Sequence, residues 1–303
     1  MMLIVIYRKV FFTLTGLLVL LSLASILFFG LKLGTDFTGG VLAEVRYSAA
    51  RPTASELAQS LDAAGLSGYS MRESQNNAFT IRAGNISSEM RAKIPAAVSI
   101  GGKYPSSIER FTEIGPIIGV ELRNKSLVAL GLVLLCILFY IAFVFRKVSE
   151  PVSSWIYGVI ALITLLHDVI VPAGFFALLG HFFGAQVDTL FVTAILTILG
   201  FSIHDTIVVF DRTRENLRIN KESRRKEDFE VTAGHSLNQT FVRSVNTSVT
   251  VLISLGALFF MGPESTQDFA LTLIVGIIAG TYSSIALATP LLVAYERFRA
   301  KRT

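Results

Sequence analysis

Long apolar runs alternate with polar segments along this chain, and each run is long enough to cross a lipid bilayer. A membrane span needs about 20 predominantly apolar residues. The first run is too long for the core of a signal peptide, and no clear small-residue cleavage site follows it, so we interpret it as an uncleaved anchor. The pattern predicts an α-helical polytopic membrane protein with six transmembrane helices, at Val10–Gly30, Leu127–Phe145, Val152–Val171, Thr189–Phe210, Phe241–Met261 and Phe269–Ala294.

The segment between the first two runs, residues 31–124, has the pattern of a small soluble domain. Two helices are expected, one behind a capping box at Thr53–Glu56 and one that begins at Ser87–Ser88. The order β-α-β-β-α-β predicts a ferredoxin-like α+β domain. Its four expected strands are Val41–Tyr47, Tyr69–Glu73, Ala78–Arg82 and Ser106–Ile114, with a turn at Gln75–Asn77 between the middle two.

The distribution of Lys and Arg predicts how the chain is oriented in the membrane. Basic residues gather in segments 1–9, 211–237 and 295–303, whereas Pro172–Asp188 and Gly262–Asp268 contain none. The positive-inside rule then places both termini and loop 211–237 in the cytoplasm, with residues 31–124 outside and residues 125–303 as a five-helix transmembrane domain. The net charge of +5 follows from this topology. We expect no nucleic-acid partner, because the basic residues of the loop alternate with acidic ones.

Motifs that would indicate an enzyme are absent from the sequence. Gly101-Gly102-Lys103 lacks the upstream glycine and the following Ser or Thr of a phosphate-binding loop. Cys136 is the only cysteine, and the His-Asp dipeptides at His167 and His204 are too far apart in sequence to indicate one metal site. We therefore expect no catalytic activity, no metal and no cofactor.

An acidic residue, Asp205, lies inside the fourth apolar run. A charge at that depth is costly and indicates a functional site. Arg243 begins the next run at a matched depth from the same face, so the two residues are expected to pair. His204 and Thr247 lie close to them in a polar patch that is able to relay protons. The alternative is a static ion pair near the interface, with Arg243 extended toward the lipid headgroups.

Two further features of the spans allow two readings each. Asp168 falls toward the outer end of the third span, where it either faces external water or belongs to an ion path. Gly276 and Gly280 in the sixth span form a small-xxx-small motif, which permits close helix approach either within this chain or against a partner.

Taken together, the motifs resemble those of the SecF family, whose members are subunits of the bacterial SecD–SecF protein-export complex. The resemblance covers nearly the whole chain. The stretches that carry it are Gly34–Gly40 (GTDFTGG), Ile114–Gly119 (IGPIIG), His167–Asp168, Gly200–Asn216 (GFSIHDTIVVFDRTREN), Leu237–Thr240 (LNQT), Arg243–Ser248 (RSVNTS), Gly262–Pro263 and Gly280–Ser284 (GTYSS).

This resemblance implies half of an RND-like membrane domain, completed by a six-helix SecD-like subunit in the bacterial cytoplasmic (inner) membrane. It implies that the chain uses the proton motive force to assist preprotein translocation after the step driven by SecA and the SecYEG channel. By motif position, Asp205 and Arg243 correspond to the residues tied to proton flow. Gly34, Asp36, Gly39 and Gly40 correspond to a hinge-like entry into the outer domain.

The chain departs from the family pattern at two positions, and two other functions remain as alternatives. His204 stands where many relatives have Asn, which places an imidazole beside Asp205. Ser244 replaces a frequent Thr and keeps its hydroxyl. An RND-type exporter of small molecules would need a larger outer region with a ligand pocket. A purely structural translocon subunit would tolerate neutralisation of Asp205.

Overall fold

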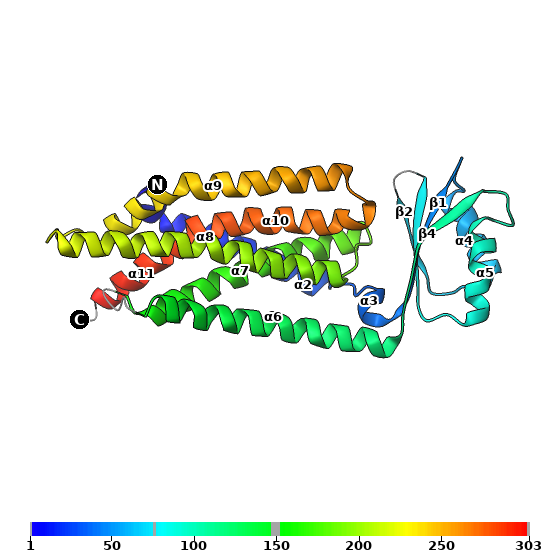
Figure 1. The fold of residues 1–303 in the computed structure, drawn as a ribbon, viewed down its shortest axis with the longest axis horizontal. Helices are drawn as coiled ribbons and strands as arrows, with labels where there is room; N and C mark the ends of the chain where they lie inside the picture. The colour runs from blue at the N-terminus through cyan, green and yellow to red at the C-terminus, as the bar shows by residue number, and fades with distance from the viewer. Residues whose placement is uncertain (1, 75–76, 147–151, 302–303) are drawn as a thin grey trace. The chain divides into compact units, whose positions relative to one another are not determined.

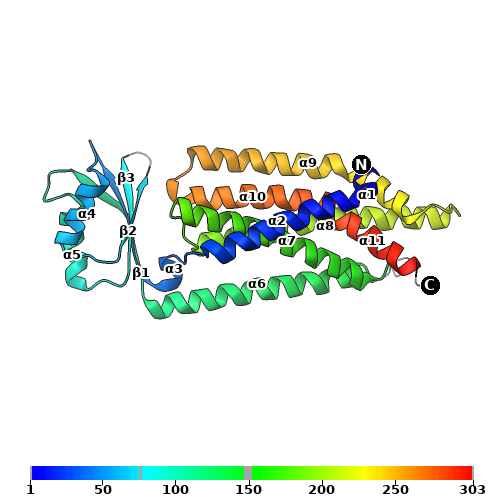
Figure 2. The ribbon, with the colours of Figure 1, turned by 180° about the vertical axis from the view of Figure 1, so that it is seen from behind.

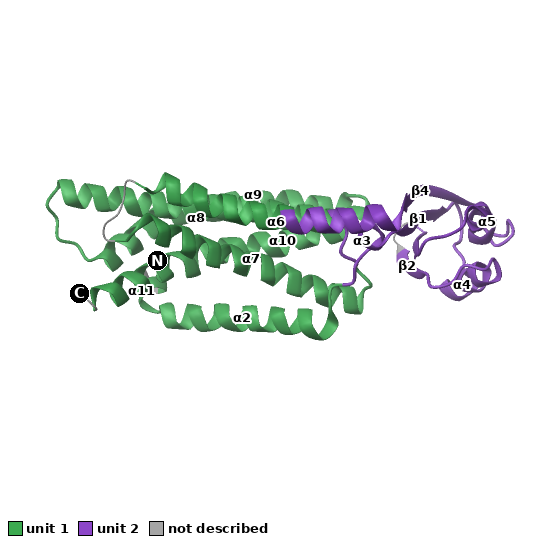
Figure 3. Cartoon of the chain, turned by 90° about the horizontal axis from the view of Figure 1, so that it is seen from below, with its two compact units in different colours: residues 1–31, 129–185, 190–303 green, residues 32–128, 186–189 purple. Residues whose placement is uncertain are grey.

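The computed structural model describes residues 2–74, 77–146 and 152–301 (Figure 1). The chain forms two compact units, which Figure 3 shows in different colours. Unit 1 comprises Met1–Leu31, Ala129–Ala185 and Leu190–Thr303, and unit 2 comprises Lys32–Val128 and Gln186–Thr189. Gln75 and Asn76 of the predicted turn, and the two ends of the chain at residues 1 and 302–303, lie outside the described residues.

Within the described residues, six helical segments are long and apolar enough to cross a membrane, which confirms the predicted number of spans. Most of these helices are longer than the apolar runs that predicted them, and the fourth and fifth, for example, continue into polar sequence. They are α2 (Arg8–Phe29), α6 (Pro116–Val144), α7 (Ser154–Phe182), α8 (Thr189–Glu222), α9 (Phe229–Met261) and the last segment, made of α10 (Gln267–Ser283), the π-helix η2 (Ser284–Ala288) and α11 (Thr289–Ala300). The short helix α1 (Met2–Ile6) precedes them, and a 3₁₀ turn η1 (Glu264–Thr266) precedes α10.

The helices of unit 1 pack side by side, with α2 and α10 both against α7 and α10 also against α9 (Figures 1 and 2). Three aromatic rings pack together in the core: Phe145 stacks on Tyr157 with centroids 5.1 Å apart, and Phe210 meets Tyr157 edge-on at the same separation. All three side chains are fully buried.

Unit 2 contains a four-stranded antiparallel sheet with two helices on one face (Figures 1 and 2). Its strand order is β2-β3-β1-β4, so the chain order β-α-β-β-α-β gives the predicted ferredoxin-like arrangement. A short helix, α3 (Thr35–Thr38), leads into the sheet. The remaining elements are β1 (Gly40–Tyr47), α4 (Ala54–Ala63), β2 (Ser70–Ser74), β3 (Ala78–Ala83), α5 (Ser88–Val98) and β4 (Ser106–Ile114).

Local polar contacts explain why the elements of unit 2 begin where they do. The capping box is formed as predicted: the Glu56 backbone N–H donates to Thr53 Oγ1 over 3.2 Å, and Thr53 N–H donates back to the Glu56 carboxylate over 3.0 Å. At the start of α5, the Ser87 side chain accepts a hydrogen bond from the Met90 backbone N–H.

In the core of unit 2, the Tyr47 hydroxyl donates to the Val98 carbonyl over 2.9 Å, and burial raises the pKa of Tyr47 to about 12.

Candidate functional site

A fully buried carboxylate, Asp168, lies in the middle of α7. Its Oδ2 accepts hydrogen bonds from Ser202 Oγ on α8 and from Ser283 Oγ on α10, the latter over 2.8 Å. Its Oδ1 lies 2.8 Å from Nδ1 of the neighbouring His167. One carboxyl group therefore joins three membrane helices, and its burial is compensated by three donors.

This position contradicts the reading of Asp168 as a residue that faces external water. The predicted span ended at Val171 because Pro172 follows it, but α7 continues through Pro172 to Phe182. A proline inside a membrane helix is tolerated when neighbouring groups satisfy the freed backbone. The extra turns shift Asp168 from the expected end of the span to its middle, where the exposed fraction of its side chain is 0%.

Two glycines of α10 let α8 and α10, the two helices whose serines donate to Asp168, pack closely against each other. A Cβ on Gly280 would lie 3.0 Å from Ser202 Cβ, and a Cβ on Gly276 would lie 2.1 Å from Ile198 Cδ1. The Gly276-xxx-Gly280 motif therefore packs α10 against α8 within this chain.

The second membrane carboxylate, Asp205, lies on α8, about one turn after Ser202, and its side chain is buried, with 4% exposed. Its Oδ2 and the Ser244 hydroxyl of α9 are both buried, and neither has a hydrogen-bond partner among the described residues. The Ser244 hydroxyl is the side chain that comes nearest to a hydrogen bond with this carboxylate, and His204 and Arg243 lie within electrostatic range of it. Asp205 is therefore a buried acid with unused hydrogen-bonding capacity, unlike the fully bonded Asp168.

The expected ion pair between Asp205 and Arg243 is not formed in this structure: in the described part of the chain, no Arg243 nitrogen lies within 4 Å of a carboxylate. The reason is rotational. Successive residues of a helix point about 100° apart, and on α9 it is Ser244 that is buried, whereas Arg243 is exposed. Thr247, one turn further on, donates its hydroxyl to the Arg243 carbonyl over 2.9 Å.

Polar and small residues form an exposed stripe along the membrane-spanning parts of α8 and α9. On α9 the stripe repeats at helical spacing, and its Thr and Ser hydroxyls donate to carbonyls of their own helix. The charged and amide side chains of the stripe cannot satisfy all their hydrogen-bonding groups on their own helix, and hydrocarbon offers them no partner. The exposed stripe consists of Thr193, Thr197, Gly200 and His204 on α8 and of Arg243, Asn246, Thr250 and Ser254 on α9.

The predicted hinge residues lie in unit 2, at the entry into the sheet domain. Gly39 and Gly40 have φ values of +77° and +134°, which L side chains rarely adopt. A Cβ on Gly39 would lie 2.7 Å from Pro116 Cα, and one on Gly40 would lie 2.3 Å from the Ala83 carbonyl oxygen. Glycine is thus required where the chain that enters the domain crosses the chain that leaves it.

The other two residues, Gly34 and Asp36, contact the loop between α7 and α8. Gly34 N–H donates to the Val187 carbonyl over 2.8 Å, and Asp36 Oδ2 accepts from Thr189 N–H and Oγ1 over 3.0 and 2.6 Å. A Cβ on Gly34 would lie 3.1 Å from the Val187 carbonyl oxygen, so a larger residue would press on this loop.

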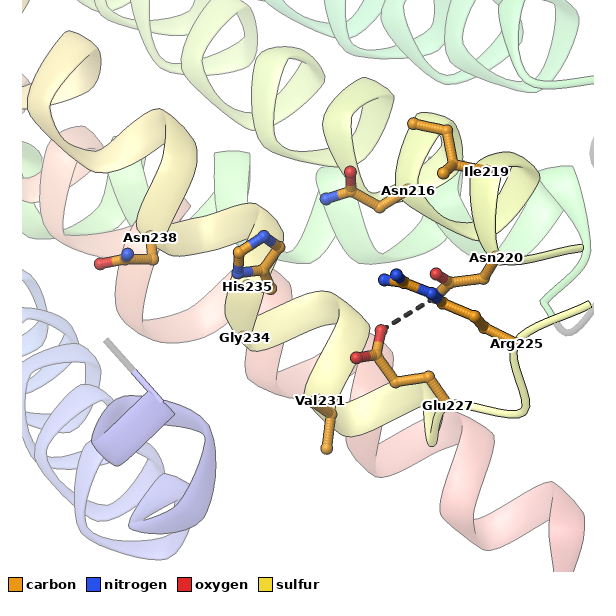
Figure 4. Close-up of a pocket in the computed structure, with 9 residues that line it drawn as sticks. All are labelled: Asn216, Ile219, Asn220, Arg225, Glu227, Val231, Gly234, His235 and Asn238. Carbon is orange, nitrogen blue, oxygen red and sulfur yellow. Dashed lines mark hydrogen bonds between the residues drawn. The ribbon is translucent and has the colours of Figure 1, made fainter. Parts of the chain in front are cut away.

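A polar pocket of about 520 Å³ lies where α8 ends and α9 begins (Figure 4). At its edge, Asn220 Nδ2 and Thr232 Oγ1 donate to Glu227 over 2.9 and 2.7 Å. The hydrogen bond from Thr232, followed by the one from Asn220, lowers the pKa of Glu227. The pocket is lined by Asn216, Ile219, Asn220, Arg225, Glu227, Val231, Gly234, His235 and Asn238.

The sequence did not reveal Ser283, although it is one of the donors to Asp168. One signal was present in the sequence: Ser283 and Ser284 interrupt the sixth apolar run. In the structure the π-helix η2 begins at Ser284. Single-turn π-helices occur frequently at functional sites. Among the described residues, no three His, Cys, Asp or Glu side chains lie close enough to hold a metal ion.

These features define a class: a polytopic membrane protein with six spans, a ferredoxin-like domain after the first, and acidic groups buried between membrane helices. Residues 99–298 match the family model described as "Protein export membrane protein SecD/SecF, C-terminal", and residues 24–50 match the "SecD/SecF GG Motif". The chain therefore belongs to the SecD/SecF family of protein-export membrane proteins.

Relatives and solved structures agree with this assignment. The chain is 42% identical to the protein translocase subunit SecF of Thermobaculum terrenum, a match that covers 96% of this chain and 92% of that one. It is 37% identical to SecF of Anaerolinea thermophila, with 95% and 92% covered. The crystal structure of SecDF from Thermus thermophilus, a translocon-associated membrane protein, matches with a TM-score of 0.82 at 30% identity. That match covers 96% of this chain but only 38% of the SecDF chain.

Proposed function

We propose that this chain is a SecF-type subunit that uses the proton motive force to assist preprotein translocation. It acts with a SecD-like six-helix partner, after the step driven by SecA and the SecYEG channel. Both termini lie in the cytoplasm, and unit 2 lies on the opposite side of the bacterial cytoplasmic membrane. The family membership and the length of the match to SecF subunits support this role.

The observation that carries the proton coupling is the state of Asp205. A carboxylate at this depth is expensive, and such residues mark ion and proton pathways. Asp205 is buried and its Oδ2 makes no hydrogen bond among the described residues, so its charge is compensated less well than that of Asp168. A group that takes up and releases a proton fits this position better than a permanently ionised one.

The proton cycle follows from the present separation of Asp205 and Arg243. When Asp205 is protonated it needs no counter-charge, and Arg243 stays on the exposed face of α9, as in this structure. When Asp205 loses its proton, the opposite charges attract, and rotation or translation of α9 brings them together. His204 and Thr247 lie beside the two residues and complete the route for the proton. Each charge that crosses the potential supplies about 2.3 kcal/mol per 100 mV.

Asp168 is a second proton-binding group in this proposal. A proton taken up on Oδ2 would compete with the two serine hydroxyls that donate to this oxygen, whereas a proton on Oδ1 would lie toward His167. Protonation on Oδ2 would loosen α7 from α8 or α10. Both carboxylates then act on α8, which carries Asp205 and Ser202.

The exposed stripe of α8 and α9 indicates where the partner binds. Arg243, Asn246 and His204 would be costly against lipid, so a second membrane subunit is expected to cover them. We propose that the SecD-like half does so, and that movement of α8 and α9 beneath it is passed to unit 2 through the entry segment formed by Gly34, Asp36, Gly39 and Gly40.

The test is Asp205→Asn in a strain depleted of the native protein, with Asp211→Asn as the matched control on the same helix. Asp211 is exposed and lies next to Arg214, so its neutralisation should not affect a buried proton site. The measurement is the rate at which a secreted preprotein completes translocation, with membrane level and partner co-purification checked. We expect Asp205→Asn to stall export in an assembled complex. Unchanged export would contradict the proton mechanism and leave Asp205 a structural residue.

A further inference from the structure

The segment that leads into unit 2 forms a short parallel pairing with the loop before α8. Leu33 pairs with Val187, Gly34 N–H donates to the Val187 carbonyl over 2.8 Å, and Val187 N–H donates to the Lys32 carbonyl over 2.7 Å. Although these residues lie more than 150 positions apart in sequence, they form one small backbone ladder.

Asp36 adds a side-chain contact at the end of this ladder, at the first residue of α8. Its Oδ2 accepts from Thr189 N–H and from Thr189 Oγ1, over 3.0 and 2.6 Å. A helix begins with backbone N–H groups that lack intrahelical partners and with the positive end of its dipole, so a carboxylate there is stabilising. The first turn of α8 contains no acidic residue, and Asp188 immediately precedes it. Asp36 therefore adds a second carboxylate to this helix start, one that comes from the entry segment.

The position of this contact on α8 gives it a consequence for transport. Asp205 lies sixteen residues beyond Thr189 on the same uninterrupted helix, about 24 Å at a rise of 1.5 Å per residue. A helix is stiff over that distance, so a displacement of α8 at Asp205 is carried to its first turn. The entry segment, which is bonded to that turn, must then move with it or lose its bonds.

We propose that Asp36 is a positioning residue that ties the entry segment Lys32–Asp36 to the start of α8, and that this clamp stays closed throughout the transport cycle. The clamp rests on the proposed function, in which α8 moves, and it gives that movement a route to unit 2. Gly34 takes part because its missing side chain lets the ladder close against Val187.

The first test compares two substitutions of the capping residue. Asparagine caps helices about as well as aspartate, whereas alanine removes the acceptor. Asp36→Ala should slow completion of preprotein export about tenfold, and Asp36→Asn less than about threefold. Hydrogen exchange of the purified chain supplies a readout that does not depend on export: the amides at the start of α8 should exchange faster in Asp36→Ala and at the normal rate in Asp36→Asn. Equal exchange in both variants would contradict the capping role.

The second test replaces the cap with a covalent bond. Leu33→Cys and Val187→Cys are introduced together in a Cys136→Ser background, because paired residues on adjacent strands lie within disulfide reach. If the clamp stays closed during transport, the oxidised pair should export normally and should restore export to Asp36→Ala, and reduction should reverse the rescue. The same pair should not rescue Asp205→Asn.

Two results would overturn the proposal. If oxidation stops export in the chain with native Asp36, the clamp must open during the cycle. If the oxidised pair restores slow hydrogen exchange to Asp36→Ala but not its export, Asp36 does not act through the clamp. Failure of the wild-type chain to restore export to the depleted strain would instead contradict the proposed function, and the exchange measurement would still decide whether Asp36 holds α8.

Discussion

The close crossing of α2 and α7 at Gly174 gives the sharpest prediction about stability. A Cβ at this position would lie 2.5 Å from both Cα and Cβ of Ser22 and 2.7 Å from its carbonyl oxygen. Carbon atoms in contact prefer about 3.5–4.0 Å, so Gly174→Ala forces the helices apart by roughly 1 Å. Because the atoms in the way belong mostly to backbone, no side-chain rotation relieves the contact.

The free-energy cost of Gly174→Ala has two parts. Overpacking of this kind costs about 1–3 kcal/mol. Separation of the helices also weakens the buried hydrogen bond from Ser25 Oγ to the Gly174 carbonyl, which is 2.7 Å long and which we value at about 0.6 kcal/mol, as for other bonds between membrane helices. We therefore expect the free energy of unfolding to fall by about 2–4 kcal/mol.

The assay is equilibrium unfolding of the purified chain in mixed micelles, followed by helix signal as denaturing detergent is added. Gly16→Ala on α2 and Gly131→Ala on α6 are the matched controls, because a Cβ at either position would meet nothing within 4 Å. Both should be as stable as the wild type or more stable by up to about 1 kcal/mol, because alanine favours a helix more than glycine does. The reasoning about this crossing would be refuted if Gly174→Ala were as stable as the two controls.

Three further predictions concern buried and capping groups. Asp168→Leu removes the hydrogen-bond acceptor for His167 Nδ1, Ser202 and Ser283, so it should lower the free energy of unfolding in mixed micelles by at least about 2 kcal/mol. Asp168→Asn keeps one acceptor oxygen and should lose about half as much. Equal losses in the two variants would contradict the hydrogen-bond account. Tyr47→Phe should cost about 0.5–1.5 kcal/mol, and because the pKa of Tyr47 is raised to about 12, thermal unfolding should show the same loss from pH 6 to pH 9. The backbone N–H of Thr53, followed by Lys103, lowers the pKa of Glu56 to about 2. Since the folded-state pKa lies below the unfolded value, the stabilisation is present above about pH 4.5 and is lost as the pH falls toward 2. The difference in melting temperature between wild type and Glu56→Gln should therefore shrink as the pH is lowered, and a difference that did not change would exclude the charged cap.

The sequence was sufficient for the architecture because both of its patterns are strong. Spans are recognised by length and hydropathy, and the sheet domain by alternation and a capping box at Thr53. The helix ends were harder to predict. After Phe210 the sequence becomes polar, yet α8 continues to Glu222, supported by exposed ion pairs such as that of Arg212 with Glu215. Hydropathy records where the apolar run stops, and a helix does not have to stop there.

The candidate site could be predicted only in part, for a geometric reason. Hydropathy and topology give the depth of a residue in the membrane, and on that basis Asp205 and Arg243 were expected to pair. They do not give the rotation of a helix about its axis, which places Ser244 toward the interior and Arg243 on the exposed face. Ser283 was missed for a related reason, because a hydroxyl in an apolar run is common and only the packing of α10 on α7 shows that it reaches Asp168.

The central claim, that a proton on Asp205 drives export, is tested most directly in membrane vesicles that contain the whole translocation complex. A preprotein is arrested partway through the membrane by removal of ATP, a proton gradient is then imposed, and completion of translocation is measured for wild type and for Asp205→Asn. We predict that the gradient completes translocation in the wild-type vesicles and has no effect in the Asp205→Asn vesicles. Equal completion in both would contradict the claim, because the gradient would then act without this carboxylate.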